Sequence, residues 1–424
     1  MARKMKDSGI EWIGEIPEGW EIKYFVQLFS QVKNKNIGLC EKNLLSLSYG
    51  KIKQKSIETV GGLLPDNFEG YNIIDRNDIV LRLTDLQNDQ HSLRVGLSHE
   101  RGIITSAYCS IRVRGAESPN YLYYYLHTFD IAKGFYGMGS GVRQGLNWDG
   151  LKYIKILLPP QHEQDRISVF LNQKTLEIDS MLSKTISSIE EYKKLKQAVI
   201  TQAITKGVRG ERKMKDSGVE WIGEIPKEWV CEKIKYATSI SRGLFNHRPR
   251  NDERYYNGKY PFIQTGDVAN ATKYIVSYSQ TLNELGKSVS KEFPKGTLTM
   301  TIAANVGDVA ILNFNAYFPD SVVGFIPNKN IRTLYLFYVF SAMKDEFTRT
   351  AIKSTQLNLN IDRVKETFIP VTLNVNEQCE IENYLESKCA EIDELIAKKE
   401  QLVKELESYK KSLIYEVVTG KREV

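Results

Sequence analysis

The strongest constraint on this chain is a fifteen-residue motif that occurs twice. Residues 3–17 read RKMKDSGIEWIGEIP, and residues 212–226 repeat this text with a single isoleucine-to-valine exchange. A tryptophan follows each copy three residues after the proline, at Trp20 and Trp229. A repeat of this length indicates that one structural unit is present twice, so we expect a fold built from two similar halves.

A second repeat lies further along each half. Glu163-Gln164 and Glu377-Gln378 each begin a segment in which apolar residues recur at alternating steps of four and three. That spacing predicts a helix with a coiled-coil seam, roughly 40 residues or about 60 Å long at ~1.5 Å per residue. The predicted seam positions are Ile167, Leu171, Ile178, Tyr192, Leu195, Val199, Ile381, Leu385, Ile392, Leu395, Leu402, Leu406, Tyr409 and Leu413.

The two repeats divide the chain into four segments. Short runs rich in Val, Ile, Leu and Tyr, punctuated by Gly, Asn and Asp, predict several strands and a helix in each globular part. We expect an α+β protein with two mixed α/β domains joined by a long antiparallel two-helix coiled coil, forming a dumbbell with an approximate two-fold axis. The predicted segments are a first domain at 1–160, a first helix at 161–207, a second domain at 208–370 and a second helix at 371–424.

Composition excludes several classes of protein. Hydrophobic residues make up 42% and charged residues 26% of the chain, as in ordinary globular proteins, and the net charge of +6 permits a nucleic-acid partner without requiring one. No apolar run is long enough for a membrane span and no signal-peptide core begins the chain, so the cytoplasm is the expected compartment. The five cysteines are odd in number and lack CxxC spacing, which indicates free thiols.

Motifs for catalysis and metal binding are missing from the sequence. It contains no HExxH, no GxxxxGK phosphate loop and no Cys/His pairing at zinc spacing. We therefore nominate no catalytic residue and no metal ligand, and we expect a protein that is not itself an enzyme.

The repeated WIGEIP opening with its tryptophan, the strand-rich domains, the I-x-L-P-P-x-x-E-Q passage at residues 156–164 and the terminal heptads together resemble the specificity subunit of a type I restriction–modification system. The resemblance covers both halves, although the second passage reads I-P-V-T in place of the L-P-P wording. It implies that each globular domain is a target recognition domain for one half of an asymmetric, two-part DNA site.

The resemblance also implies partners and cofactors. The helix pair would act as a spacer that docks two adenine methyltransferase subunits, and restriction or translocase subunits could join them. S-adenosylmethionine, ATP and Mg²⁺ are then expected only on partner subunits. We expect the nearly identical opening motifs to pack at helix ends and to help dock the methyltransferase, and the divergent segments to read different bases.

Candidate DNA contacts follow from residue type and position. Residues 140–147 align with 353–360, which places Arg143 on Gln356; arginine can bind guanine and glutamine adenine, although a polar loop is an equal alternative. Lysines on one strand face and arginines in an irregular loop suit phosphates, against the alternative of a solvated surface. For Arg82, an internal ion pair to Asp78 or Asp85 competes with DNA contact. The candidates are Lys51, Lys53, Lys55, Arg82, Arg143, Gln144, Asn147, Arg242, Arg248, Arg250, Gln264, Thr265, Gln356, Asn358 and Asn360.

Two other functions remain open on the sequence alone. A coiled-coil scaffold could present two protein-binding domains, and a stand-alone regulator could bind DNA without a methyltransferase. Duplex-DNA binding by the assembled complex would separate the first of these from a specificity subunit, and specific binding without a methyltransferase would identify the second.

Overall fold

The structure is a computed structural model, and it describes residues 3–56, 67–86, 89, 93–138, 145–350, 352–353 and 357–424. The chain forms two compact units. Unit 1 comprises residues 1–186 and 401–424, and unit 2 comprises residues 187–400. Each unit therefore contains one globular part and stretches of both long helices. The boundaries of the four segments set out from the sequence stay a prediction.

The described part of unit 1 contains short strands and three helices shorter than the long pair. Its described elements are β1 (Met5–Asp7), β2 (Glu15–Pro17), β3 (Glu21–Tyr24), α1 (Phe25–Leu28), β4 (Phe29–Gln31), a 3-10 turn (Ile37–Leu39), β5 (Leu44–Ser48), β6 (Lys51–Lys55), β7 (Asn72–Ile74), β8 (Ile79–Leu81), β9 (Val95–Leu97), β10 (Gly102–Ile104), β11 (Cys109–Val113), α2 (Pro119–Ile131), α3 (Trp148–Leu151) and β12 (Lys155–Leu158).

Unit 2 follows a similar order. Its described elements are β13 (Met214–Asp216), β14 (Glu224–Pro226), β15 (Val230–Lys233), α5 (Ile234–Ala237), β16 (Thr238–Arg242), a 3-10 turn (Glu253–Tyr255), β17 (Tyr256–Phe262), α6 (Thr265–Asn270), β18 (Tyr274–Ile275), β19 (Gln280–Leu282), α7 (Glu284–Ser288), β20 (Glu292–Phe293), β21 (Leu298–Thr301), β22 (Val309–Leu312), β23 (Ala316–Tyr317), β24 (Val322–Pro327), α8 (Thr333–Ala342), α9 (Lys344–Thr350), β25 (Ile352–Lys353), β26 (Leu357–Asn358), α10 (Ile361–Glu366) and β27 (Phe368–Val371).

The two units share one sheet topology. In unit 1, β5 pairs with β10 in parallel, and antiparallel neighbours flank them in the order β6-β5-β10-β7. In unit 2, β17 pairs with β23 in parallel within the matching order β19-β17-β23-β20. The second sheet repeats as well, β4-β11-β8-β9 in unit 1 against β16-β24-β21-β22 with β18 added in unit 2. The predicted repetition of a mixed α/β domain is therefore confirmed where the sequences differ strongly.

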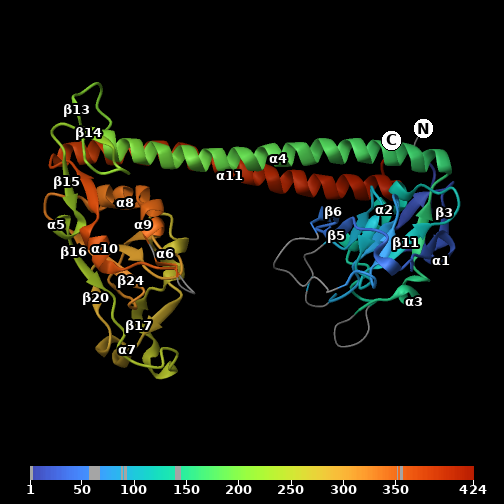
Figure 1. Ribbon diagram of the computed structural model, residues 1–424, viewed down its shortest axis with the longest axis horizontal. Helices are drawn as coiled ribbons and strands as arrows, with labels where there is room; N and C mark the ends of the chain where they lie inside the picture. The colour runs from blue at the N-terminus through green and yellow to red at the C-terminus, as the bar shows by residue number, and fades with distance from the viewer. Residues whose placement is uncertain are drawn as a thin grey trace. The chain divides into compact units, whose positions relative to one another are not determined.

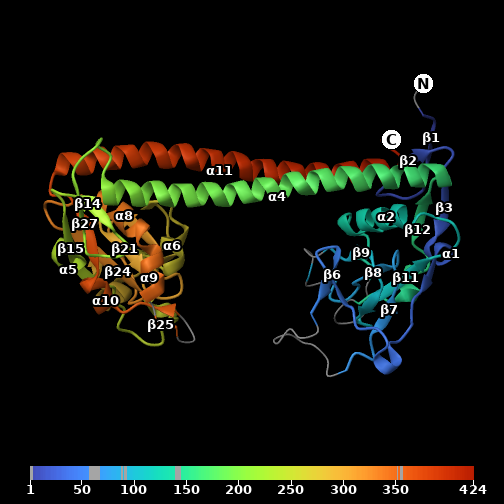
Figure 2. The same cartoon turned by 45° about the horizontal axis from the view of Figure 1, so that its top comes forward.

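The long helices are α4 (Gln161–Lys206), with 46 residues, and α11 (Val375–Val418), with 44 residues. In unit 1 the first part of α4 lies along the last part of α11, and in unit 2 the last part of α4 lies along the first part of α11 (Figure 1). The helices are therefore antiparallel, as predicted. In the view of Figure 2, α2 lies beneath α4 in unit 1, and α8 lies near the helices in unit 2.

The buried stripe of the helices has a period of eleven residues. In α4 it comprises Ile167, Ile178, Ile189 and Ile200, and in α11 it comprises Ile381, Ile392, half-buried Val403 and Ile414. Eleven residues per three turns is about 3.67 residues per turn, close to the ~3.6 of a straight α-helix. A strict heptad needs ~3.5 and hence a left-handed supercoil.

This period corrects the predicted heptad seam. Four of its positions are largely exposed, with relative exposures of 48% for Leu195, 41% for Leu395, 42% for Leu402 and 50% for Tyr409. Steps of 3.5 residues drift around a helix with a longer period, so they leave the buried stripe after a few turns. The other positions lie on or near the stripe: Ile167, Leu171, Ile178, Ile381, Leu385, Ile392 and Leu413 are buried, and Tyr192, Val199 and Leu406 are half-buried.

Candidate nucleic-acid interface

A partly buried ion pair joins the opening motif of unit 1 to the start of α4. The Arg3 guanidinium donates to both carboxylate oxygens of Glu163, at 2.6 and 2.7 Å, and Trp20 Nε1 donates to Glu163 Oε2 at 2.9 Å. Burial raises the pKa of the Glu163 carboxyl, but the hydrogen bonds from Arg3 and Trp20 outweigh burial and leave that pKa below its ordinary value. The motif is thereby fixed at a helix end.

Unit 2 repeats the same arrangement with different surroundings. Arg212 pairs with Glu377, and Trp229 Nε1 donates to Glu377 Oε2 at 3.2 Å. The glutamate side chain is only 2% exposed here, against 14% for Glu163. The repeated motif and the repeated glutamate are therefore one structural device present twice, which agrees with the expected packing at helix ends.

The glutamine after each glutamate holds the next helix of its domain. Gln164 Oε1 accepts a hydrogen bond from the backbone N–H of Ser118 at 2.9 Å, immediately before α2. Gln378 Oε1 accepts from the backbone N–H of Arg332 at 2.8 Å, immediately before α8. Because these N–H groups lie at helix N-termini, they need such an acceptor. The Glu-Gln pair therefore recurs because the glutamate binds the opening motif and the glutamine binds the start of a helix in the same domain.

The unit 1 candidates from the sequence fall into two kinds. Lys51 Nζ lies 3.0 Å from Asp179 Oδ2 of α4, whereas Lys53 and Lys55 are exposed on the edge strand β6. Arg82 Nη2 lies 3.5 Å from Asp89 Oδ2. An internal ion pair, which was the alternative to DNA contact for Arg82, is therefore formed, but with an aspartate other than the two considered.

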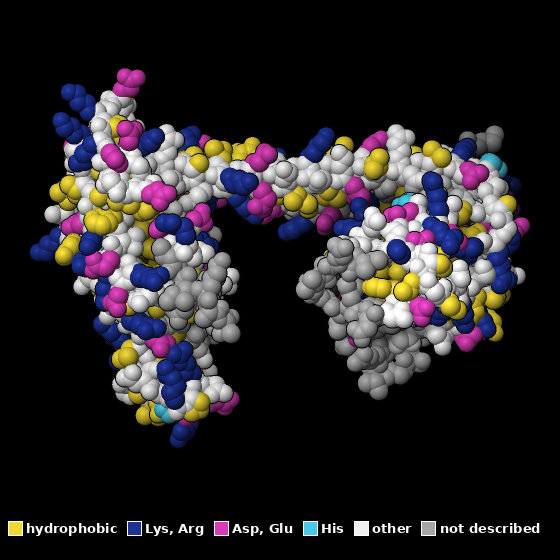
Figure 3. Space-filling view, in the orientation of Figure 1, with side chains coloured by type: hydrophobic (Ala, Val, Ile, Leu, Met, Phe, Trp, Pro, Cys, Tyr) yellow, Lys and Arg dark blue, Asp and Glu magenta, His cyan; other side chains and the backbone are white. Residues whose placement is uncertain are grey.

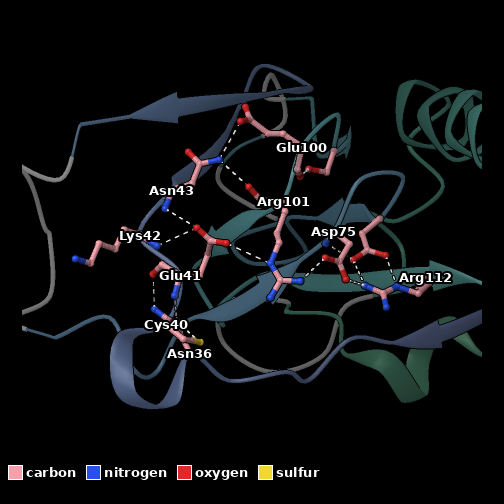
Figure 4. Close-up of polar contacts among 11 residues, drawn as sticks. Asn36, Cys40, Glu41, Lys42, Asn43, Asp75, Glu100, Arg101 and Arg112 are labelled. Atoms are coloured by element: carbon pink, nitrogen blue, oxygen red, sulfur yellow. Dashed lines mark hydrogen bonds and ion pairs between the residues drawn. The ribbon is translucent and has the colours of Figure 1, made fainter.

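An arginine network crosses the sheets of unit 1 (Figure 4). Arg112 contacts the buried Asp78 at 2.7 Å and Asp75 at 2.7 Å, and Arg101 contacts Asp75 at 3.0 Å and Glu41 at 3.2 Å. The Asp78 contact above all raises the pKa of Arg112 above its ordinary value. Three carboxylates around two guanidinium groups leave no excess positive charge, so this network stabilises the domain and is a poor phosphate site.

A fully buried arginine anchors the chain around Arg82. Arg94 is 0% exposed, and its guanidinium donates to the carbonyls of Arg82 at 3.0 Å and Thr84 at 2.8 Å. Its Nε donates to the Tyr136 hydroxyl at 3.0 Å. A buried arginine is rare unless its donors are used in this way. Sequence reasoning missed Arg94, because no pattern distinguishes it from the exposed arginines.

Asparagines that we proposed as DNA contacts serve as helix caps. Asn147 Oδ1 accepts from the Gly150 N–H at 3.1 Å at the start of α3, and Asn360 Oδ1 accepts from the Asp362 N–H at 2.7 Å at the start of α10. Their shared position in the repeat thus has a structural reason. Arg143, Gln144 and Gln356 lie outside the described residues, as does the side chain of Asn358, whose backbone is in β26.

The unit 2 candidates lie on two parts of the domain. Gln264 precedes α6, which begins at Thr265, and its amide donates to Gln280 Oε1 at 2.8 Å. Arg242, Arg248 and Arg250 gather around a single aspartate, Asp320. No sequence pattern points to this partner, which lies 70 residues after Arg250.

Comparison with known proteins places the chain in a family. Residues 240–405 match the model of the type I restriction modification DNA specificity domain. The putative type I restriction enzyme MjaX specificity subunit of Methanocaldococcus jannaschii is 24% identical over 428 residues, covering 96% of this chain and 95% of that protein. The MjaVIII specificity subunit of the same organism is 24% identical over 426 residues, covering 96% and 93%. Together the family model and these relatives support the identification of the chain as a specificity subunit of a type I restriction enzyme.

Solved structures support the fold of the chain. A chain from work on complex assembly and conformational transition of the type I R-M system aligns with a TM-score of 0.73 at 15% identity, covering 96% of this chain and 99% of that one. The HsdS subunit from Thermoanaerobacter tengcongensis aligns with a TM-score of 0.51 at 14% identity, covering 96% and 98%. These similarities support recognition of a DNA sequence within a restriction–modification complex, and they do not favour the scaffold and stand-alone regulator interpretations.

Two further observations concern the described residues alone. None of their helices combines the length and apolar character needed to cross a membrane. No group of three or more His, Cys, Asp and Glu side chains among them is placed to hold a metal ion.

Proposed function

We propose that the two domains of this specificity subunit read the two halves of an asymmetric DNA site and direct adenine methylation and restriction by partner subunits. One observation carries the proposal. The arginine and tryptophan contacts of Glu163 and Glu377 recur in both units, whereas the sequences of the domains that they support differ strongly. A common support with divergent surfaces suits two readers of different base sequences.

The pair of long helices is an argument for a constant number of base pairs between the two half-sites. An antiparallel pair of α-helices with a buried stripe resists bending better than a loop, and protein geometry fixes half-site spacing in other two-part DNA binders. The same repeat supports two methyltransferase subunits, one for each copy of the opening motif. Spacing and stoichiometry are both parts of the proposal.

The proposal also assigns the chemistry to other subunits. The chain itself has no catalytic role in it, and S-adenosylmethionine, ATP and Mg²⁺ are held by the methyltransferase and restriction subunits. The complex acts in the cytoplasm, where it meets chromosomal DNA. The sequence motifs support this division of labour, because none of those that bind phosphate or catalytic zinc is present.

The test is a methylation map. The chain is expressed with its methyltransferase partner, and methylated adenines in genomic DNA are scored by single-molecule sequencing. We expect one asymmetric motif with a gap of constant length. An exchange of residues 20–140 for those of a relative should change one half of the motif and leave the other half and the gap as they were. A motif that stays the same after this exchange would contradict the assignment of the domains.

A further inference from the structure

The arginine cluster of unit 2 is built differently from that of unit 1. Arg250 pairs with the Asp320 carboxylate, Arg248 Nη2 lies 3.7 Å from Asp320 Oδ2, and Arg242 Nε donates to the Asp320 carbonyl at 2.5 Å. The Asp320 carboxylate thus faces two guanidinium groups, and a third is bonded to the backbone carbonyl of the same residue. Because arginine stays charged at every physiological pH, the cluster carries an excess of two positive charges.

Local structure brings these groups together. Gly243 N donates to the Val322 carbonyl at 2.9 Å, and Leu244 N donates to the Phe318 carbonyl at 3.0 Å. A Cβ on Gly243 would lie 2.2 Å from the Pro319 carbonyl oxygen, so only glycine permits this approach. The segment around Gly243 and the segment 318–322 therefore lie in close contact, and this contact places Asp320 next to the arginines.

The loop that carries the arginines is also held internally. Arg248 Nη1 donates to the carbonyls of Phe245 at 2.7 Å and His247 at 2.8 Å. The His247 ring stacks on Tyr255 with centroids 4.0 Å apart, and its Nε2 lies 3.0 Å from Asp252 Oδ2. A loop with so many internal bonds loses little entropy when it binds a ligand, which favours affinity.

The guanidinium groups keep capacity for a ligand. The side chains of Arg248 and Arg250 are 54% and 47% exposed, and Arg242 is also exposed. Each guanidinium has five N–H donors, and the described contacts of Arg242 and Arg250 engage a single nitrogen each. In the space-filling view, Lys and Arg side chains gather over the part of unit 2 around α7 (Figure 3).

We propose that Arg242, Arg248 and Arg250 form a backbone-phosphate clamp of unit 2 that binds DNA regardless of its sequence. Phosphodiester oxygens suit a cluster of exposed, preorganised guanidinium groups with surplus positive charge. Phosphate contacts fix the position of a protein on the duplex but carry no base information. The clamp therefore sets the affinity and register of unit 2, while other residues of the domain read bases. This inference rests on the proposed DNA-binding function.

The experiment uses the full chain assembled with its methyltransferase partner. Binding to a duplex without the recognised motif and to a duplex with it is measured over a series of salt concentrations, for the wild type and for Arg248→Ala/Arg250→Ala. We expect the double variant to bind both duplexes roughly 10-fold or more weakly. Its slope of log affinity against log salt should fall by about one unit for each arginine removed. The methylated motif should stay the same.

Two matched variants sharpen the result. Arg254 is an exposed arginine of the same loop, and its guanidinium is paired with Asp252 at 2.7 Å. The salt slope of the Arg254→Ala complex should therefore match that of the wild type. Arg248→Lys/Arg250→Lys keeps the charges, so it should recover most of the affinity, because lysine still binds phosphate. Melting curves of each complex show whether unit 2 remains folded.

Other outcomes overturn the clamp. An unchanged salt slope in a folded Arg248→Ala/Arg250→Ala complex would mean that these arginines contact no phosphate. A loss confined to the duplex with the motif, or an altered methylation motif, would mean that they read bases. These outcomes are distinct from failure of the proposed function, in which the wild-type complex itself would show no two-part motif.

Discussion

The Asp179 carboxylate on α4 accepts a hydrogen bond from the Lys410 ammonium of α11 at 2.5 Å. The repeat forms the same contact a second time, between Asp393 and Lys196 at 2.7 Å. Each aspartate lies 214 residues from its counterpart, and so does each lysine. The helices of both units are therefore held in register by one ion pair used twice.

We predict different strengths for the two ion pairs. The side chains of Asp179 and Lys410 are 32% and 24% exposed, and those of Asp393 and Lys196 are 54% and 32% exposed. Screening by water weakens the more exposed pair. Double-mutant cycles with alanine, measured by thermal unfolding, should give a coupling of about 0.5–1 kcal/mol for the first pair and less for the second. Equal couplings would show that exposure does not decide their strength.

Loss of the arginine partner should affect the two opening motifs unequally. Arg212→Ala leaves the Glu377 carboxylate, whose side chain is 2% exposed, without its cation. Breaking a buried pair in this way costs about 3 kcal/mol or more. Arg3→Ala acts on the more exposed Glu163 and should cost about 1 kcal/mol. Thermal unfolding of both variants checks the order, and a greater loss for Arg3→Ala would refute it.

The period of eleven residues makes a prediction about exposed leucines. Ile189 is 7% exposed on the stripe, whereas Leu195, a position of the heptad pattern, is 48% exposed. Ile189→Ala should lower the free energy of unfolding by about 2 kcal/mol. Leu195→Ala should change it by less than about 0.5 kcal/mol. If chemical denaturation shows the larger loss of unfolding free energy for Leu195→Ala, the heptad pattern would describe the buried face better than the eleven-residue period.

Acid should weaken unit 1 through His127. Burial, with smaller contributions from Lys410 and Lys411, lowers the pKa of His127 from 6.5 to about 4, and its Nδ1 has no hydrogen-bond partner in the described structure. The unfolded chain therefore takes up a proton at a higher pH than the folded chain does. The stabilising contribution is complete above pH ~6.5 and declines as the pH falls towards ~4.

The measurement is thermal stability against pH. His127→Gln should remove much of the loss between pH ~6.5 and ~4, which amounts to at most about 3 kcal/mol. Identical pH curves for wild type and His127→Gln would exclude His127 as the cause.

The candidate DNA-binding residues were harder to predict from the sequence than the repeated opening motifs and their glutamate partners. Arg112 and Arg250 are both exposed arginines near aspartates, yet the first is surrounded by excess carboxylate and the second belongs to a cluster with excess positive charge. Their partners lie 34 and 70 residues away along the chain. Asn147 and Asn360 aligned correctly, but the capped helices that explain them became evident only in the fold.

The repeat, the two long helices and their antiparallel course could be predicted from the sequence, because they depend on local patterns and on the order of motifs. The shared sheet topology, the face that each helix buries and the charge balance of each arginine cluster became evident only in the folded chain. Burial and ion pairing depend on groups brought together from distant segments, as the close approach at Gly243 brings Asp320 to Arg250. A residue's type records its charge, but only its neighbours in space determine whether that charge remains available for DNA.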